Sequence, residues 1–327
     1  MNIKISIIIL NWNGKEDTLE CLSSVRGIDY PAYDIIVADN GSSDDSVSSI
    51  REAYPEVTIL ENGANLGFAE GNNRAIRYAL QHGADAVVLL NNDTIVDSNI
   101  LRAFCDAYIT LPNAGILGAT AFYYDRPEIV WAAGANWDYS IHEQRFIGQG
   151  LPRSSLPDNK PYEVEFVLGC ALFVHREVID SIGVMDPIFF LEYEDTDWCW
   201  RAKKKGYKNY SVPDAILWHK VSSSFGGESP IWKYYMTRNG LLWAKRHLHR
   251  DEYICVKHKL IREFIPSFPI PNGRSLKVFY WEITAWLRTL MRHFREPYYM
   301  AVLYGVFHYF INEFGGCPPR VMARLQK

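Results

Sequence analysis

The segment at residues 86–93 joins a short apolar run to two asparagines and an aspartate, Asp93. Such a run, bounded by polar residues, is typical of a strand buried on both faces of a sheet. Ligands of open α/β sheets bind just beyond the carboxyl ends of these strands. Because hard divalent cations prefer oxygen ligands and often retain substrate phosphates, we expect Asp93 to hold a metal ion beside a diphosphate. The alternative is an ordinary turn or helix cap, the more common role of an isolated Asp after a strand.

A second acidic segment, EYEDTD at 192–197, comes directly before a helical pattern that Gly206 ends. Asp195 is placed to cap this helix, which we expect to run through Lys205. A helix start favours negative charge and lowers the pKa of a carboxyl group, so Asp195 is expected to be ionised at neutral pH. The alternative is that Asp195 only caps the helix and that Asp197 belongs to its first turn.

The elements that must position these residues alternate between strand and helix patterns. Strands are expected at 5–10, 33–38, 57–61, 86–90, 115–124, 164–174 and 207–218. Helices are expected at 17–25, before 53, before 82, and at 98–111, 175–183 and 195–205. The alternation of the first four strands with helices predicts a parallel, doubly wound α/β sheet. The weaker pattern at 125–160, rich in Gly, Pro and aromatic residues, predicts hairpins or a long functional loop.

Composition excludes several classes of protein. The chain has 327 residues, of which 48% are hydrophobic and 22% charged, as in ordinary globular proteins. Its six cysteines are scattered without a CxxC pair, which argues against a zinc site or a disulfide framework and favours a reducing compartment. No apolar run reaches the roughly 18 residues needed to span a bilayer. Neither a Walker A sequence nor a GxGxxG motif occurs, so a P-loop or a dinucleotide site is unsupported.

Charge is distributed unevenly along the chain. Residues 232–327 hold 16 Lys and Arg against 6 Asp and Glu, whereas the preceding residues are acidic. Two segments of this basic tail, 275–294 and 298–315, mix aromatic with basic residues, as helices lying in a membrane interface do. We therefore expect peripheral membrane contact through the tail. The alternative is a pair of helices that pack on the preceding domain or on a second subunit.

Six motifs occur in order along roughly the first 245 residues: SIIILNWNG (6–14), VADNGSSDDS (37–46), NLGFAEGNNRAI (65–76), LLNNDT (89–94), FFLEYEDTDWCWRAKKKGY (189–207) and HKVSSSFG (219–226), followed by YYMTRNGLL (234–242). On these motifs the chain resembles glycosyltransferase family 2, and within it the branch that includes rhamnosyltransferases of surface-polysaccharide assembly. The resemblance implies a GT-A fold with a doubly wound, mostly parallel sheet. It also implies a catalytic domain at 1–245, with a nucleotide-binding half at about 1–125 and an acceptor half at about 126–245, and a helical tail at 246–327.

The resemblance also assigns roles to individual residues. Asp93 corresponds to the metal-binding carboxylate of the family's DXD motif, whose first acidic position is Asn91 here, and His219 to a further metal or phosphate contact. Asp195 aligns with the catalytic base. Residues implied in nucleotide binding are Asn11, Asn13, Asp39, Asn65, Gly67, Asn72, Asn91 and Asn92. Residues implied in acceptor binding are Glu194, Asp197, Trp198 and Arg238.

The implied reaction is transfer of a sugar, with inversion, from a nucleoside diphosphate donor to an acceptor hydroxyl. The expected cofactor is Mg²⁺ or Mn²⁺, the donor is a dTDP- or UDP-sugar such as one of rhamnose, and the acceptor is a saccharide or a lipid-linked saccharide. A cytoplasmic location, including the inner face of the cell membrane, is expected, without nucleic-acid binding. A homodimer is compatible with the sequence.

Two alternative functions are open at this point. A sugar nucleotidyltransferase also uses an α/β sheet, a metal and a diphosphate, but it would be expected to carry a Gly-rich loop with Arg or Lys near the N-terminus. The segment Asn11–Lys15 is a poor version of such a loop. A non-catalytic protein that binds nucleotide sugars or glycans is the second alternative. Asp93 and Asp195 argue against it, whereas Asn91 leaves it open.

Overall fold

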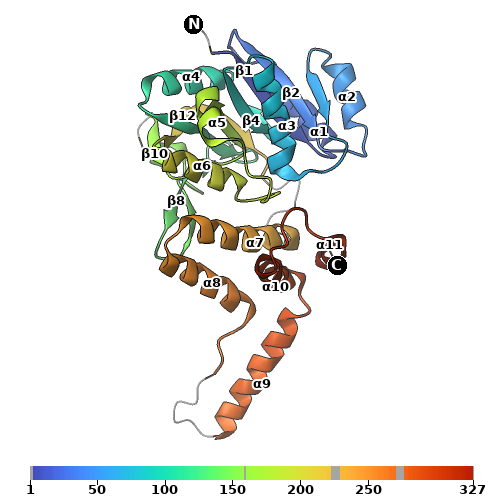
Figure 1. The fold of residues 1–327 in the computed structure, drawn as a ribbon, viewed down its shortest axis with the longest axis vertical. Coiled ribbons are helices and arrows are strands. Elements are labelled where there is room, and N and C mark those ends of the chain that lie inside the picture. Colours follow the sequence, from blue (N-terminus) through green and yellow to red (C-terminus); the bar gives the residue numbers. More distant parts are fainter. Residues whose placement is uncertain (1–2, 158–159, 222–228, 270–275, 327) are drawn as a thin grey trace. The chain divides into compact units, whose positions relative to one another are not determined.

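The computed structural model describes residues 3–157, 160–221, 229–269 and 276–326. Most of the predicted motif at 219–226 therefore lies outside the described residues. The chain divides into two compact units, Met1–Ser224 and Phe225–Lys327 (Figure 1). The division falls before residue 245, where the domain boundary was predicted, because helix α7 (Pro230–His247) groups with the helices that follow it.

A mixed, mostly parallel sheet forms the centre of the first unit, with the strand order β10-β12-β6-β11-β4-β1-β2-β3. The strands β1 (Ile5–Asn11), β2 (Tyr33–Asp39), β3 (Thr58–Glu61) and β4 (Ala86–Asn91) are parallel. Strand β11 (Ala171–His175) runs antiparallel between β4 and β6 (Ala114–Tyr123), and β6 is parallel to β12 (Lys208–His219). The short strands β5 (Thr94–Val96), β7 (Val130–Ala132) and β10 (Tyr162–Val164) pair at the margins.

The predicted α/β class is confirmed, and one predicted strand is corrected. The strand expected at 164–174 is two strands, β10 and β11, separated by a connection that contains Gly169. The excursion predicted at 125–160 contains β7 and a separate two-stranded ribbon, β8 (Ala135–Asp138) with β9 (Glu143–Phe146), followed by a 3₁₀ turn at Arg153–Ser155. The connection at Gly169 matters because it places a backbone N–H beside the candidate base.

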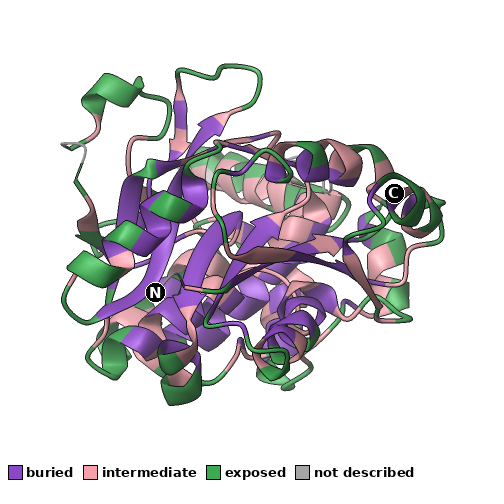
Figure 2. Ribbon diagram, turned by 90° about the horizontal axis from the view of Figure 1, so that it is seen from above, coloured by how far each residue is buried: buried purple, intermediate pink, exposed green. Residues whose placement is uncertain are grey.

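Helices cover both faces of the sheet, and the strands form the buried core (Figure 2). They are α1 (Lys15–Val25), α2 (Ser46–Ala53), α3 (Gly67–Gln81), α4 (Ile100–Thr110), α5 (Arg176–Ile182) and α6 (Glu194–Lys204). In β1, Ile5, Ile7 and Ile9 pack in one core cluster with Leu22 of α1 and Phe104 of α4. Burying each such side chain stabilises the fold by about 1.5–3 kcal/mol. This rigid core holds the polar residues that follow the strands.

The second unit consists of helices α7, α8 (Arg250–Phe264), α9 (Leu276–His293), α10 (Pro297–Phe310) and α11 (Pro319–Leu325). Helix α10 packs closely against α7 at Gly305. A Cβ atom added there would lie only 2.9 Å from the Thr237 side chain and from the Tyr234 carbonyl oxygen. Within the described part of the chain, every helix is too short or too polar to cross a bilayer.

Candidate active site

Asp93 and His219 lie side by side at one edge of the sheet. Asp93 follows β4, and His219 ends β12, which pairs with β5 so that His219 is opposite Thr94. The Lys220 backbone N–H donates to the Asp93 carbonyl oxygen at 3.0 Å. Oδ1 of Asp93 lies 3.0 Å from Nε2 of His219, and the two residues are only 5% and 6% exposed. The structure thus brings together the two residues predicted as metal ligands.

The chemistry of this pair fits a hard or borderline divalent cation. A carboxylate and an imidazole are both ligands of such ions. Within the described residues, Oδ1 of Asn91 and Nδ1 of His219 are buried and have no hydrogen-bond partner. The described residues hold no group of three His, Cys, Asp or Glu arranged for a metal. A cation here would therefore take its remaining ligands from substrate phosphates or water, which is how Mg²⁺ is usually held in phosphate-processing sites.

Contacts on two sides hold the end of β12 in position. The ring of Trp131 meets the ring of His219 edge-on, with centroids 4.6 Å apart. The Lys220 ammonium group lies 2.6 Å from Asp17 and 2.5 Å from Glu20, both on α1. Because α1 and β12 are far apart in sequence, this pair of ion contacts fixes His219 relative to the N-terminal half of the sheet.

Asp195 lies in the first turn of α6, and its carboxylate accepts three hydrogen bonds. Oδ2 accepts from the Gly169 backbone N–H at 2.9 Å, whereas Oδ1 accepts from the backbone N–H of Thr196 at 2.6 Å and from its hydroxyl at 3.1 Å. The prediction that Asp195 caps the helix was wrong, because α6 begins at Glu194 and the preceding position is Tyr193, in left-handed geometry. Asp195 instead binds groups on two different elements.

The pKa of Asp195 is raised from its ordinary value, because burial disfavours the charged form more strongly than the hydrogen bonds favour it. The predicted lowering of this pKa was therefore wrong in sign. A higher pKa makes Asp195 a stronger base once it is ionised, which is the direction that suits proton removal near neutral pH.

Two neighbouring glutamates share this environment. Burial, followed by the charge of Asp195, raises the pKa of Glu192 to about 7. The pKa of Glu194 is raised well above its ordinary value by burial and then by Asp195 and Glu192, and among the described residues its Oε2 has no hydrogen-bond partner. Asp195 accepts three hydrogen bonds that stabilise its charge, so its carboxyl group is well suited to stay ionised.

Backbone strain is concentrated just before α6. Phe190, Glu192 and Tyr193 have φ values of 64°, 67° and 72°, a region that costs a non-glycine residue roughly 1–2 kcal/mol. The surrounding contacts must compensate this cost. One such contact is the hydrogen bond from the Phe68 backbone N–H to the Phe190 carbonyl oxygen, at 2.6 Å.

A continuous path of contacts joins the two acidic centres. The Asn91 backbone N–H, two residues before Asp93, donates to the Cys170 carbonyl oxygen at 3.0 Å, and the adjacent Gly169 N–H donates to Asp195. The pKa of the Cys170 thiol is raised by burial and then by the negative charges of both Asp93 and Asp195. Both carboxylates therefore lie at the same end of the β4–β11 pair.

The first predicted nucleotide loop is organised by buried hydrogen bonds. Asn11 is fully buried, and its amide donates to Oδ1 of Asp39 at 2.9 Å and to the Ser42 hydroxyl at 3.1 Å. Oδ2 of Asp39 accepts from the backbone N–H groups of Gly41 and Ser42 at 3.1 and 3.0 Å. The structure gives Asn11 and Asp39 a loop-forming role, so direct contact between Asn11 and a nucleotide is corrected to indirect positioning.

Other predicted nucleotide residues also hydrogen-bond to the protein itself, within their own segment or to a neighbouring one. Oδ1 of Asn13 accepts from the Ser43 backbone N–H at 2.7 Å, and Oδ1 of Asn65 accepts from the Gly67 N–H at 2.9 Å. Asn72 is almost fully buried and donates to the Phe68 carbonyl oxygen at 2.9 Å, so its predicted nucleotide contact is corrected to support of α3. Asn92 donates to the Thr18 hydroxyl at 3.0 Å, which ties the segment before Asp93 to α1.

Gly67 offers a test of how closely the second loop packs on the strained segment. Its φ is +78°, and an added Cβ would overlap the Phe190 carbonyl oxygen and ring, whereas Gly63, at φ +76°, has open space around it. We expect Gly67→Ala to lower the free energy of unfolding by about 3 kcal/mol or more, from left-handed geometry plus overpacking, and Gly63→Ala by only about 1 kcal/mol. Urea unfolding of both variants measures the difference, and equal losses would contradict the Phe190 contact.

Two predicted acceptor residues belong to the core of α6. Asp197 is 1% exposed and pairs with Nε of Arg201 at 2.7 Å, while the guanidinium of Arg201 also donates to the Val184 carbonyl oxygen at 2.9 Å. Trp198 is fully buried, and its indole N–H donates to the Gly183 carbonyl oxygen at 2.8 Å. Neither side chain is open to a sugar, so both predictions of acceptor binding are corrected to packing of α6 against the end of α5.

Arg238, the third of these predictions, is buried inside the helical unit. Its guanidinium donates to the Tyr234 hydroxyl at 3.2 Å, to the Gly315 carbonyl oxygen at 2.7 Å and to the Asn239 side chain at 3.0 Å. A fully buried guanidinium with these partners stabilises its own unit. The predicted contact with an acceptor or phosphate is corrected accordingly.

Comparison with known proteins identifies the family. The sequence model described as "Glycosyl transferase family 2" matches residues 6–183, which is more than half of the chain. The chain belongs to glycosyltransferase family 2. It is similar to the dTDP-rhamnosyl transferase RfbF of Shigella flexneri, with 24% identity over 76% of this chain and 82% of the relative. It is also similar to the N-acetylglucosaminyl-diphospho-decaprenol L-rhamnosyltransferase of Mycobacterium tuberculosis, with 28% identity over 58% of this chain and 67% of the relative.

Solved structures of glycosyltransferases share the fold of this family 2 member. The mannosyltransferase PcManGT from Pyrobaculum calidifontis, in complex with GDP-Man and Mn²⁺, has a TM-score of 0.57 and 14% identity, covering 96% of this chain and 88% of that one. S. aureus TarS 1–349 in complex with UDP has a TM-score of 0.53 and 15% identity, covering 95% and 89%. These neighbours confirm the predicted GT-A fold.

Reasoning from sequence missed several groups around Asp195 in this glycosyltransferase. The Gly169 N–H and the Thr196 hydroxyl bind Asp195 directly, and the Gln144 amide on β9 donates to the Thr196 hydroxyl at 2.9 Å. Gln144 shows that the excursion at 125–160 reaches the start of α6. The sequence around Gln144 does not indicate a role at the site. Thr196, in contrast, could have been predicted because it immediately follows the candidate base.

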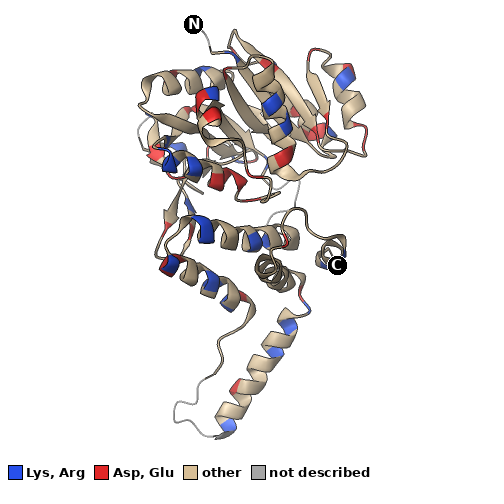
Figure 3. Cartoon of the chain, in the orientation of Figure 1, with Lys and Arg blue, Asp and Glu red and all other residues tan. Residues whose placement is uncertain are grey.

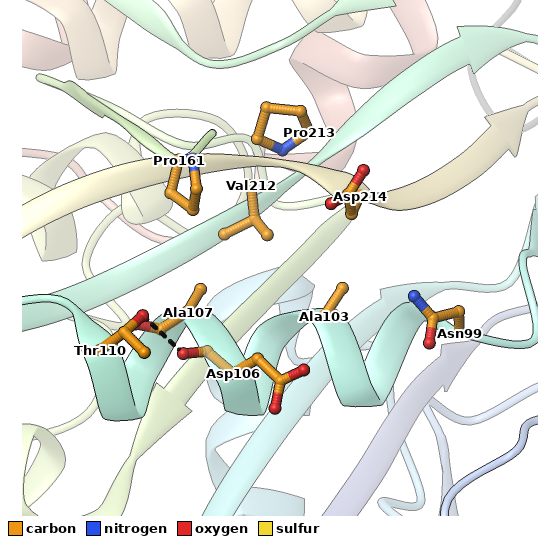
Figure 4. Close-up of a pocket in the computed structure, with 9 residues that line it drawn as sticks. All are labelled: Asn99, Ala103, Asp106, Ala107, Thr110, Pro161, Val212, Pro213 and Asp214. Carbon is orange, nitrogen blue, oxygen red and sulfur yellow. Dashed lines mark hydrogen bonds between the residues drawn. The ribbon is translucent and has the colours of Figure 1, made fainter. Parts of the chain in front are cut away.

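A pocket of about 210 Å³ lies elsewhere in the family 2 domain (Figure 4). It is formed between α4 and the middle of β12, where Val212 faces Ala103 and Ala107. No predicted site residue lines it. The carboxyl ends of the strands, rather than this pocket, are therefore the candidate active site.

Proposed function

We propose that this glycosyltransferase moves a sugar, with inversion, from a nucleoside diphosphate donor to a hydroxyl group of a saccharide or lipid-linked saccharide. The observation that supports the proposal most is the placement of Asp93, His219 and Asp195 at one end of the β4–β11 pair. Displacement at the anomeric carbon needs one group for the departing diphosphate and another for the proton of the incoming hydroxyl.

Asp93 and His219 form the proposed leaving-group side. Together they would hold a divalent cation, Mg²⁺ or Mn²⁺, which when bound supplies charge stabilisation to the diphosphate. Oδ1 of Asn91 is a further potential ligand at this end of β4, in the place of the first DXD carboxylate. With one carboxylate instead of two, the protein binds the cation more weakly, so we propose that donor and cation bind together.

Asp195 forms the proposed acceptor side. Its carboxylate takes the proton of the acceptor hydroxyl as the acceptor oxygen bonds to the anomeric carbon. At the same time the bond from that carbon to the diphosphate oxygen breaks, and its electron pair leaves with the diphosphate. The hydrogen bonds from Gly169 and Thr196 fix the orientation of the carboxylate, which reduces the entropy cost of the aligned arrangement.

The relatives suggest the substrates. Because two of them are named as rhamnosyl transferases, we propose a dTDP-linked or UDP-linked sugar as the donor, with dTDP-rhamnose first, and a sugar attached to a lipid diphosphate as the acceptor. We further propose that the protein acts at the cytoplasmic face of the membrane, where its basic tail makes peripheral contact. The loops 11–14, 39–46 and 65–73 are proposed to surround the nucleotide.

Release of free nucleoside diphosphate tests the proposal and separates it from both alternatives. The purified protein is incubated with dTDP-rhamnose or UDP-sugars and Mn²⁺, with and without a synthetic N-acetylglucosaminyl-diphospho-lipid. The proposal expects diphosphate release that the acceptor accelerates. A nucleotidyltransferase would instead form pyrophosphate from a nucleoside triphosphate and a sugar phosphate, and a binding protein would release neither, so either result would overturn the proposal.

A further inference from the structure

Helix α9 of the C-terminal unit carries an exposed apolar stripe. Tyr280, Leu287 and Met291 are 65%, 45% and 54% exposed. Their spacing of seven and four residues puts them on one face of the helix. Single exposed apolar residues are normal on a protein surface, whereas several grouped on one helix face indicate an interaction surface.

A basic stripe runs beside the apolar stripe. Lys277, Arg288 and Arg292 are exposed, and a rotation of 100° per residue places them together, about a quarter of a turn from the apolar stripe. Glu282 is the one acidic residue within α9 (Figure 3). An apolar face flanked by Lys and Arg, with aromatic residues such as Trp281 close by, is the pattern of helices that lie in a lipid interface.

The other side of α9 is already occupied by its own unit. The Trp286 indole N–H donates to the Pro266 carbonyl oxygen at 2.8 Å, and Nδ1 of His293 lies 2.6 Å from the Phe264 carbonyl oxygen. The His293 ring also stacks on Tyr299, with centroids 3.7 Å apart. Both residues project away from the two stripes. The contacts that hold α9 in its unit therefore leave both stripes exposed to solvent.

We infer that these two stripes dock α9 on the surface of an anionic lipid bilayer. Charge decides between a bilayer and a second copy of this chain as the occupant. In a symmetric dimer the same patch would face itself, and its arginines would repel one another. Phosphate headgroups complement the arginines, while Tyr280, Leu287 and Met291 enter the acyl boundary. This inference deepens the proposed function, since a lipid-linked acceptor is found at such a surface.

Vesicle co-sedimentation of the full chain tests the inference. Phosphatidylcholine vesicles with phosphatidylglycerol should bind the protein, and vesicles without it should bind much less. Arg288→Glu with Arg292→Glu should weaken binding by about fivefold or more per arginine, since each basic residue near an anionic surface contributes about 1 kcal/mol. Leu287→Asp with Met291→Asp should weaken binding roughly tenfold or more, because these side chains are removed from the acyl boundary.

The matched control for charge is Lys204→Glu with Lys205→Glu. This pair makes the same change in net charge on exposed lysines of the catalytic unit. It should keep vesicle binding near that of the wild type. Equal loss in control and α9 variants, or undiminished binding in the α9 variants, would overturn the inference. So would a lower oligomeric state of the α9 variants by light scattering, which would assign the stripes to a dimer.

Activity on soluble substrates separates this inference from the proposed function. The α9 variants should release nucleoside diphosphate from donor and a soluble acceptor at the wild-type rate, because the changes lie outside the proposed catalytic residues. If the wild-type protein shows no such release yet binds anionic vesicles through α9, the proposed function fails and the docking surface stands.

Discussion

Replacing Asp195 by asparagine should lower the turnover number for sugar transfer by about 10²- to 10⁴-fold, the range that a positioned general base contributes. Asparagine keeps the size of the side chain and one acceptor oxygen for the Thr196 N–H, but it cannot take a proton. Donor binding should remain close to that of the wild type, because Asp195 faces the acceptor in our proposal. Steady-state transfer rates and donor titration by calorimetry measure the two effects separately.

Asp197→Asn is the matched control for this substitution, because it makes the same chemical change two residues later. Asp197 pairs with Arg201 inside α6, so its loss should reduce the free energy of unfolding by about 3 kcal/mol while the folded enzyme keeps its turnover. Glu194→Gln distinguishes the adjacent carboxyl group. If Glu194→Gln abolished transfer and Asp195→Asn did not, the assignment of the base would move to Glu194.

The pH dependence of transfer follows from the same assignment. Because burial raises the pKa of Asp195, its ionised form is lost at a higher pH than for an ordinary aspartate. The rate should therefore fall on acidification through a pKa above about 4 and level off on the alkaline side. The Glu192 carboxyl group, with a pKa of about 7, should add a further inflection, since its charge disfavours a second charge on Asp195.

The main elements of the fold could be predicted from sequence because their signals are local. The apolar runs 5–10 and 86–90 are strands, and the polar residues after them lie at the carboxyl end of the sheet. The antiparallel direction of β11 could not be predicted, because strand direction depends on the connection around Gly169 rather than on residue pattern.

Roles of single polar residues were harder to predict, because each role depends on the residue's neighbours in the folded structure. Acidic residues at 192–197 look alike in sequence, yet Asp195 faces a backbone N–H of another element while Asp197 faces Arg201 one turn along its own helix. The sign of the Asp195 pKa shift depends on burial, which three-dimensional packing decides and which a helix-start argument leaves out. Arg238 was likewise assigned to acceptor binding, whereas its guanidinium is bound by three partners inside the helical unit.

Replacing Asp93 by alanine should weaken binding of the nucleotide donor in the presence of Mn²⁺ by about 100-fold or more. Loss of an outer-shell partner already costs roughly 10- to 100-fold in metal affinity, and loss of a ligand should cost at least as much. The substitution also leaves Nε2 of His219 without its partner at 3.0 Å, so the second proposed ligand loses its orientation. Calorimetric titration of nucleoside diphosphate with Mn²⁺, and again with a chelator, measures the effect.

Asp97→Ala is the matched control, because it removes a carboxylate four residues further on. That carboxylate accepts the Asn99 backbone N–H at 2.9 Å, just after β5. The substitution should lower stability by about 1 kcal/mol, as the loss of a helix cap does, and leave donor binding unchanged. When a chelator removes the cation, the wild type and Asp93→Ala should bind the nucleotide equally weakly, because Asp93 is proposed to act through the cation. A donor affinity that falls in Asp93→Ala but is the same with and without chelator would assign Asp93 to structure rather than to metal binding. Together the four titrations separate loss of the cation from loss of the fold, which a single rate measurement on one variant could not do.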